Sequence, residues 1–110
     1  MVALSHVESM LKVMVDQLVA NYAPQRVILF GSYAEDRADS DSDIDLLIIK
    51  VTSENLGRRM DDVRAITAGT HPGVPLDPLV LTPDEVDGQI KRGDQFLAQI
   101  LKRGRVLYAA

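Results

Sequence analysis

Two short stretches of this sequence decide its fold. Leu29–Ala34 reads Leu-Phe-Gly-Ser-Tyr-Ala, and Ser42–Ile49 reads Ser-Asp-Ile-Asp-Leu-Leu-Ile-Ile. Arg26–Phe30 is a run of β-branched and aromatic residues that ends at Gly31, which is typical of a buried strand. The nearly continuous apolar character of Ile44–Ile49 favours a second strand that is covered on both faces. These two strands are the starting point for a small β-sheet.

Carboxylates at the start of the second strand indicate a cation site. Because successive side chains of a strand alternate between faces, Asp43 and Asp45 project to the same side. They repel each other unless a cation lies between them, and Mg²⁺ is a hard cation that takes carboxylates, phosphate oxygens and water. Asp77 is isolated among apolar neighbours and would add a third carboxylate if its strand lies beside the second. Three convergent carboxylates are typical of a two-metal phosphoryl-transfer site.

Gly31 and Ser32 are candidates for a phosphate site at the same end of the sheet. Glycine allows an anion to approach the backbone closely, and free N–H groups and the Ser32 hydroxyl can bind phosphate oxygens. The segment that follows them can begin a helix. Phosphate and metal would then meet at one end of the sheet.

The acidic stretch between these motifs also suggests a calcium loop, but that interpretation fails. A loop starting at Asp39 needs glycine at its sixth position and an acid at its twelfth. Ile44 and Lys50 stand at those positions. A loop starting at Asp41 fails in the same way.

The remaining elements are predicted from apolar periodicity and turn residues. The first half holds a helix over Val7–Tyr22 stopped by Ala23-Pro24, and a helix capped by Thr52 or Ser53 with Leu56, Met60 and Val63 on one face and Arg59 elsewhere. The second half holds a strand over Val74–Leu81, a helix starting at Thr82, a helix with Phe96, Leu97, Ile100 and Leu101 ending near Gly104, and a strand over Arg105–Tyr108. Pro75 and Pro78 favour an edge position for the Val74–Leu81 strand. We therefore expect one α/β domain over residues 1–110, with helices packed on a small mixed sheet.

Composition limits the possible functions. The 110 residues are 46% apolar and contain no cysteine, which excludes disulfides, thiolate zinc sites and thiol nucleophiles and fits a cytoplasmic location. With 16 acids against 12 bases, net charge −4, a broad nucleic-acid-binding surface is not expected. No signal peptide is readable, and no run approaches the roughly 18 apolar residues of a membrane span.

Two features of the C-terminal third stay open at this point. Five bases follow Asp87, namely Lys91, Arg92, Lys102, Arg103 and Arg105, against one acid, Asp94. They could bind an acidic partner or the nucleotide, or they could only complement a helix dipole. Apolar spacing also does not tell whether Phe96, Leu97 and Ile100 are core or interface.

The combination of motifs is more specific than either alone. Gly31-Ser32, ten intervening residues and then Asp43-x-Asp45 resemble the signature of the polymerase-β-like nucleotidyltransferase superfamily. The sequence resembles in particular the minimal nucleotidyltransferase (MNT) family, whose members are antitoxin partners of HEPN-domain ribonucleases. The resemblance runs over essentially the whole chain. It includes Pro75–Asp77, Leu81–Glu85 and Gly104–Tyr108.

The resemblance implies a reaction and a role for each site residue. AMP would pass from ATP, with Mg²⁺ at a two-ion site, to a tyrosine hydroxyl of a cognate HEPN toxin and inactivate it. Gly31 and Ser32 would hold the β- and γ-phosphates, and Asp43 and Asp45 would ligate metal. Asp77 would complete the second metal site and help to deprotonate the hydroxyl. Because 110 residues leave no room for an acceptor domain, we expect a heteromeric complex in which the partner supplies the acceptor.

Two alternatives remain. Family members often carry Arg and Gly where this chain has Glu35 and Asp36, a departure that would weaken triphosphate binding. It favours an antitoxin that neutralises its toxin by binding alone. The other alternative is nucleotidyl transfer to a small molecule such as an aminoglycoside, with an acceptor pocket completed by another subunit.

Overall fold

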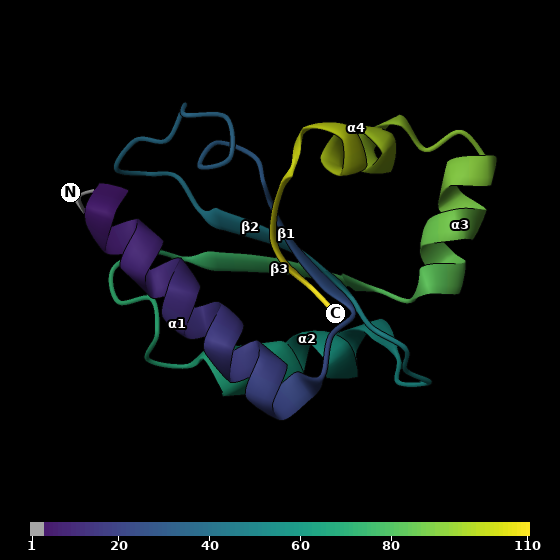
Figure 1. Ribbon diagram of the computed structural model, residues 1–110, viewed down its shortest axis with the longest axis horizontal. Coiled ribbons are helices and arrows are strands. Elements are labelled where there is room, and N and C mark those ends of the chain that lie inside the picture. Colours follow the sequence, from purple (N-terminus) through teal and green to yellow (C-terminus); the bar gives the residue numbers. More distant parts are fainter. Residues whose placement is uncertain (1–3) are drawn as a thin grey trace.

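The described part of the chain forms four helices and four strands. The computed structural model describes residues 4–110. Its elements, shown in Figure 1, are α1 (Leu4–Tyr22), β1 (Arg26–Phe30), β2 (Ile44–Ile49), α2 (Leu56–Thr67), β3 (Leu76–Leu81), α3 (Pro83–Lys91), α4 (Gln95–Arg103) and β4 (Arg105–Ala109). This is the predicted order of elements. None of the helices in residues 4–110 is long and apolar enough to cross a membrane.

The strands form one mixed sheet in the order β3-β2-β1-β4. β1 pairs antiparallel with both β2 and β4, whereas β2 and β3 are parallel. Parallel neighbours need a crossover connection, and α2 lies within the segment that makes it. β3 is an edge strand, as its prolines predicted, because Pro78 has no N–H to donate to a second neighbour. The α/β fold with a small mixed sheet is confirmed.

Helices cover both faces of this sheet, which gives three layers (Figure 1). Side-chain alternation along β1 and β2 sends Leu29 and Leu46 into the core beneath α1 and α2, and Ile28 and Leu47 into the core beneath α3 and α4. Asp45 lies between Ile44 and Leu46 and therefore shares the face of Leu47. The site carboxylate consequently points to the α4 side of the sheet.

The first helix ends where its sequence predicted. Its inner face is a stripe at helical spacing, and the buried side chains are Val7, Leu11, Met14, Leu18 and Tyr22. α1 ends at Tyr22, Ala23 adopts a left-handed backbone with φ 50°, and Pro24 prevents continuation. Lys50 links the C-terminal end of α1 to the sheet. Its ammonium group donates a hydrogen bond to the Tyr22 carbonyl and lies 4.5 Å from the centre of the Tyr22 ring.

The predicted cap and buried face of the second helix are wrong in part. Asn55, and not Thr52 or Ser53, caps α2 by accepting a hydrogen bond from the Arg58 N–H. Leu56 is exposed, whereas Arg59 is buried with Val63. The Arg59 guanidinium donates to Glu85 at 2.6 Å, to the Glu54 carbonyl at 2.8 Å and to the Val80 carbonyl at 3.2 Å. A charged side chain can be buried here because all sides of its planar fork find acceptors.

The link from Arg59 to Glu85 predicts a stability loss. Arg59→Met keeps most of the apolar stem but leaves Glu85 and two carbonyls without their donor, so we expect it to lower the free energy of unfolding by about 2–3 kcal/mol. Arg58→Met is the matched control, because Arg58 pairs with Asp62 at the surface and such pairs contribute at most about 1 kcal/mol. Urea unfolding of both variants measures the difference. Equal losses would contradict a structural role for the buried pair.

The C-terminal elements resolve one of the open questions. Thr82 caps α3 in a capping box with Glu85, with Pro83 at the start of the helix as predicted. Asp94 caps α4, and Gly104 ends it. Leu97 and Ile100 are buried, whereas 62% of the Phe96 surface is exposed. Leu97 and Ile100 are therefore core residues, and Phe96 is not.

Candidate active site

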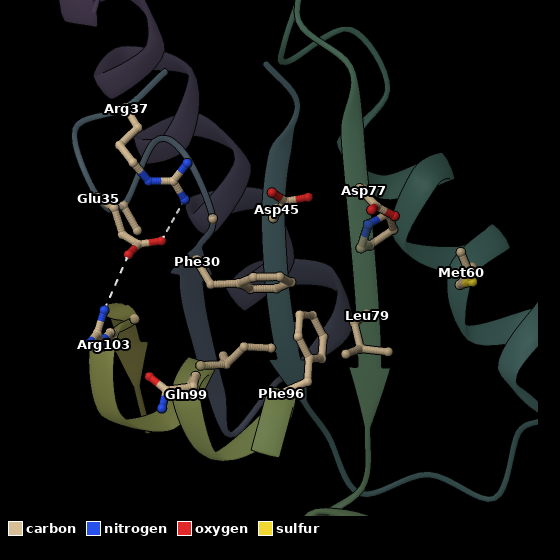
Figure 2. A pocket seen from close by; sticks show the side chains of 15 residues that line it. Phe30, Glu35, Arg37, Asp45, Met60, Asp77, Leu79, Phe96, Gln99 and Arg103 are labelled. Carbon is tan, nitrogen blue, oxygen red and sulfur yellow. Dashed lines mark hydrogen bonds and ion pairs between the residues drawn. The ribbon is translucent and has the colours of Figure 1, made fainter. Parts of the chain in front are cut away.

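A row of three side chains crosses the sheet at the end of β1. Phe30 of β1 stands opposite Asp45 of β2, and Asp45 stands opposite Asp77 of β3. All three belong to the α4 face, and Figure 2 shows the two carboxylates on neighbouring strands above the Phe30 ring. Paired residues on adjacent strands lie about 5 Å apart. The parallel pairing of β2 with β3 thus brings Asp77 beside Asp45, which is the strand arrangement that a third carboxylate at this site needs.

A cavity of about 790 Å³ opens over this row (Figure 2). Among the predicted site residues, Gly31, Asp45 and Asp77 line it. Ser32 and Asp43 do not: Ser32 is a half-exposed turn residue, and Asp43 is exposed just before β2. The structure therefore brings three of the five predicted residues to one cavity wall. The other two are close to these residues in the sequence, since Ser32 follows Gly31 and Asp43 lies two residues before Asp45.

The segment after β1 was expected to begin a helix, but it forms a set of turns instead. The Gly31 carbonyl accepts hydrogen bonds from the N–H groups of Ala34 at 3.1 Å and Glu35 at 3.2 Å. Within residues 4–110, the N–H groups of Ser32 and Tyr33 donate to no protein acceptor. The anion-binding potential of this loop therefore rests on free backbone donors in a turn and needs no helix dipole.

Gly31 is required by both backbone conformation and space. Its φ of +74° belongs to the left-handed region that glycine adopts readily. A Cβ at this position would overlap Oδ2 of Asp45 and lie 3.2 Å from its Cγ. The glycine thus lets the loop pass directly against the carboxylate.

The negative charges of Asp43, Asp45 and Asp77 favour the binding of a cation. Burial, followed by the negative charges of Asp77 and Asp43, raises the pKa of Asp45 from its usual 3.8 to about 6. No lysine or arginine in residues 4–110 forms an ion pair with any of these three carboxylates. The like charges are therefore uncompensated by the protein itself.

The donor set fits Mg²⁺ in kind, although a complete protein cage is absent. No group of three acidic or histidine side chains in the described part of the chain is close enough to form one. Mg²⁺ is usually held by one or two carboxylates together with substrate phosphates and waters. Asp45 and Asp77 on neighbouring strands, beside a loop with free N–H groups, match that pattern. The metal-ligand role of Asp43, Asp45 and Asp77 stays a prediction.

The raised pKa of Asp45 predicts how stability depends on pH. Between about pH 4 and pH 6 the folded chain keeps a proton on Asp45 that the unfolded chain releases. The free energy of unfolding therefore falls as the pH rises through this range, and it levels off above about pH 6. Partial exposure of Asp45 reduces the effect to about 1–2 kcal/mol. In EDTA, Asp45→Asn should match the wild type below pH 4 and be more stable at pH 7. Thermal unfolding across this range measures it, and parallel curves would contradict the assignment.

The other walls of the cavity contain residues whose contacts were not predicted from the sequence. Glu35 pairs with Arg37 at 2.9 Å and lies 3.9 Å from a guanidinium nitrogen of Arg103, on α4. Phe30 and Phe96 form an edge-to-face pair with ring centres 5.9 Å apart and an angle of 85° between the planes. The Glu35–Arg103 and Phe30–Phe96 contacts depend on where α4 docks, so the acidic Glu35 and the basic, apolar character of that helix were the sequence signals for them, but neither revealed the contact.

Comparison with known proteins supports a nucleotidyltransferase fold. No curated protein matches the sequence significantly. A solved structure from Sulfolobus solfataricus, described as a nucleotidyltransferase, is similar over 96% of this chain and 87% of its own, with TM-score 0.59 and 22% identity. A toxin-antitoxin with AMP-PNP (TM-score 0.63, 18% identity) and a mutant of the toxin-antitoxin MntA-HpeT (TM-score 0.59, 16% identity) each match over 91% of this chain and 73% of theirs. At these identities the structures share the fold.

A sequence profile decides the family. The profile of the family described as "Polymerase beta, Nucleotidyltransferase" matches residues 14–110. The match includes Gly31, which follows β1, and the strands β2 and β3, which carry Asp45 and Asp77; all three residues line the cavity. The chain belongs to the polymerase β nucleotidyltransferase family.

Proposed function

We propose that this nucleotidyltransferase is an antitoxin that transfers AMP from ATP to a tyrosine hydroxyl of a cognate HEPN ribonuclease toxin. The observation that carries the proposal is the juxtaposition of Asp45, Asp77 and the Gly31 loop in one cavity. The toxin-antitoxin structures among its structural neighbours, one of them with AMP-PNP, support the choice of partner and nucleotide. The MNT resemblance of the sequence supports the tyrosine acceptor.

In this proposal, the residues along the row and in the Gly31 loop have separate roles. The free N–H groups of Ser32 and Tyr33 and the Ser32 hydroxyl would hold the β- and γ-phosphates beside Gly31. Asp43, Asp45 and Asp77 would hold Mg²⁺, which when bound neutralises triphosphate charge and lowers the pKa of the attacking hydroxyl. Asp77 would accept the proton as the tyrosine oxygen bonds to the α-phosphorus and the bond to the β-phosphate oxygen breaks, releasing pyrophosphate. Catalysis is then mainly positioning and charge neutralisation.

Intact-mass measurement tests this proposal directly. The chain is incubated with the cognate HEPN protein, ATP and Mg²⁺, and the HEPN protein should gain multiples of one AMP on tyrosine. An ATP analogue with a methylene group between the α- and β-phosphorus atoms is the matched control, because its α–β bond cannot be broken. An unchanged mass with ATP would refute AMP transfer to the toxin.

Binding without catalysis is the alternative that a specific observation favours. Glu35 forms ion pairs with Arg37 and Arg103, which are the only two basic residues lining the cavity in residues 4–110. A carboxylate that occupies both arginines opposes triphosphate binding. A chain carrying Asp43→Asn and Asp45→Asn discriminates between the two functions: continued toxin neutralisation indicates masking, and lost neutralisation by a folded variant indicates catalysis.

The Glu35 ion pairs also predict a change in nucleotide affinity. Glu35→Gln frees Arg37 and Arg103 to donate charge-assisted hydrogen bonds to phosphate, so we expect MgATP to bind about threefold to tenfold more tightly. Asp36→Asn is the control, because it removes the same charge from the next residue, which pairs with neither arginine. Isothermal titration measures both variants. Equal gains would indicate a general charge effect and would contradict a specific role for Glu35.

A further inference from the structure

The cavity has two chemically different sides. Glu35, Arg37 and Arg103 form a charged side, as shown at the left of Figure 2. Phe30, Phe96 and Leu79 form an apolar side beneath the carboxylates. A ligand that fills this space needs both a charged end and an apolar end.

Phe96 is the unusual member of the apolar side. Its exposed fraction is 62%, although its neighbour Leu97 is almost completely buried. The edge-to-face contact with Phe30 holds its ring in place at the cavity wall. An exposed aromatic ring with a restrained orientation costs little further entropy when a flat group packs on it.

The proposed reaction implies where the leaving group and the acceptor lie along the row Phe30, Asp45 and Asp77. In an in-line displacement the leaving pyrophosphate and the attacking hydroxyl lie on opposite sides of the α-phosphorus. With the phosphates at Gly31 and the acceptor at Asp77, this line runs parallel to the row Phe30, Asp45 and Asp77. The nucleoside is bonded to the same phosphorus but does not lie on this line. Phe30 and Phe96 form the cavity wall beside the line (Figure 2).

We propose that Phe96, held by Phe30, is a stacking surface for the nucleobase of the nucleoside triphosphate. This inference rests on the proposed nucleotidyl transfer and adds its base-binding residue. Stacking on an aromatic ring is tolerant of base identity, because every base has a π-face. Gln99 lies one helical turn beyond Phe96, also lines the cavity, and offers an amide to the edge of a stacked base.

Affinity for ligands with and without a base tests the inference. Phe96→Ala should weaken binding of MgATP about tenfold and leave binding of magnesium tripolyphosphate unchanged, whereas Phe96→Tyr should retain both affinities. Val106→Ala is the control, since Val106 is an exposed apolar residue of β4 outside the cavity. Because Phe96 lies outside the buried core, these variants are expected to fold, and circular dichroism verifies it.

Each outcome has a separate meaning for the two proposals. An unchanged MgATP affinity, or an equal loss for tripolyphosphate, overturns the stacking surface while AMP transfer can stand. A raised KM for the HEPN acceptor with unchanged MgATP affinity also overturns it and moves Phe96 to the partner interface. A selective loss of MgATP affinity without any AMP transfer by the wild type supports the stacking surface and overturns the transferase function. Absence of MgATP binding by the wild type overturns both.

Discussion

Asp45→Asn is expected to reduce AMP transfer about a thousandfold while making the metal-free protein more stable at pH 7. Asparagine keeps the shape of the side chain but removes the charge at the centre of the row, where Asp45 faces Asp77. Loss of one preorganised charge-stabilising group typically costs a hundredfold to a thousandfold in rate. The rate of AMP incorporation into the acceptor, measured with saturating Mg²⁺, gives the first quantity, and thermal unfolding in EDTA gives the second.

The opposite signs of the two effects make this prediction selective. The carboxylate is destabilising in the free protein because burial and neighbouring acids disfavour its charge. A variant that loses activity and stability together would indicate a structural role only. A variant that keeps its activity would refute the catalytic assignment of Asp45. Asp43→Asn, measured beside it, tests whether an exposed residue outside the cavity wall contributes to the same site.

Gly31→Ala is expected to damage the site through contact with Asp45. The added methyl would meet Oδ2 of Asp45, so either the loop or the carboxylate must move. Because displacements of about 1 Å in a catalytic group can cost about a hundredfold, we expect AMP transfer to fall by at least about that factor. The strained left-handed backbone adds a stability loss of about 1–2 kcal/mol.

Gly69→Ala separates these two causes. Gly69 has φ +78°, close to the +74° of Gly31, but a Cβ there would meet nothing within 4 Å. We expect this control to lose a similar amount of stability from backbone strain and to keep its activity. Calorimetry and the AMP-transfer assay are run on both variants. If Gly69→Ala loses as much activity as Gly31→Ala, the explanation by contact with Asp45 is wrong.

The strands were predictable because each carries its own signal. The apolar runs Arg26–Phe30 and Ile44–Ile49 match β1 and β2 residue for residue. The third strand was predicted from Val74 and begins at Leu76. Local patterns of this kind are sufficient for strands whose two faces are both buried. The expectation that Asp43 and Asp45 share a side assumed that both belong to the strand, whereas β2 begins at Ile44 and Asp43 does not line the cavity.

The buried face of α2 and the walls of the cavity were not predictable in this way. The periodicity around Leu56 and Met60 does not reveal that Arg59 is buried, because its acceptors Glu85 and Val80 come from distant segments. The same holds for Phe96, whose contact with Phe30 depends on how α4 docks on the sheet. The helical pattern gave Phe96 and Leu97 equal standing, yet only Leu97 is core.

Local sequence patterns were sufficient to predict the fold class and the order of elements. They also singled out glycine and aspartate as candidates for a phosphate and metal site, because periodicity and side-chain chemistry are local properties of the chain. The folded chain was needed to show that Gly31, Asp45 and Asp77 line one cavity while Ser32 and Asp43 do not. It also placed Phe96 and the Glu35 ion pairs around that cavity. The pairing of β2 with β3 and the docking of α4 depend on packing between segments far apart in the chain, which local patterns do not reveal.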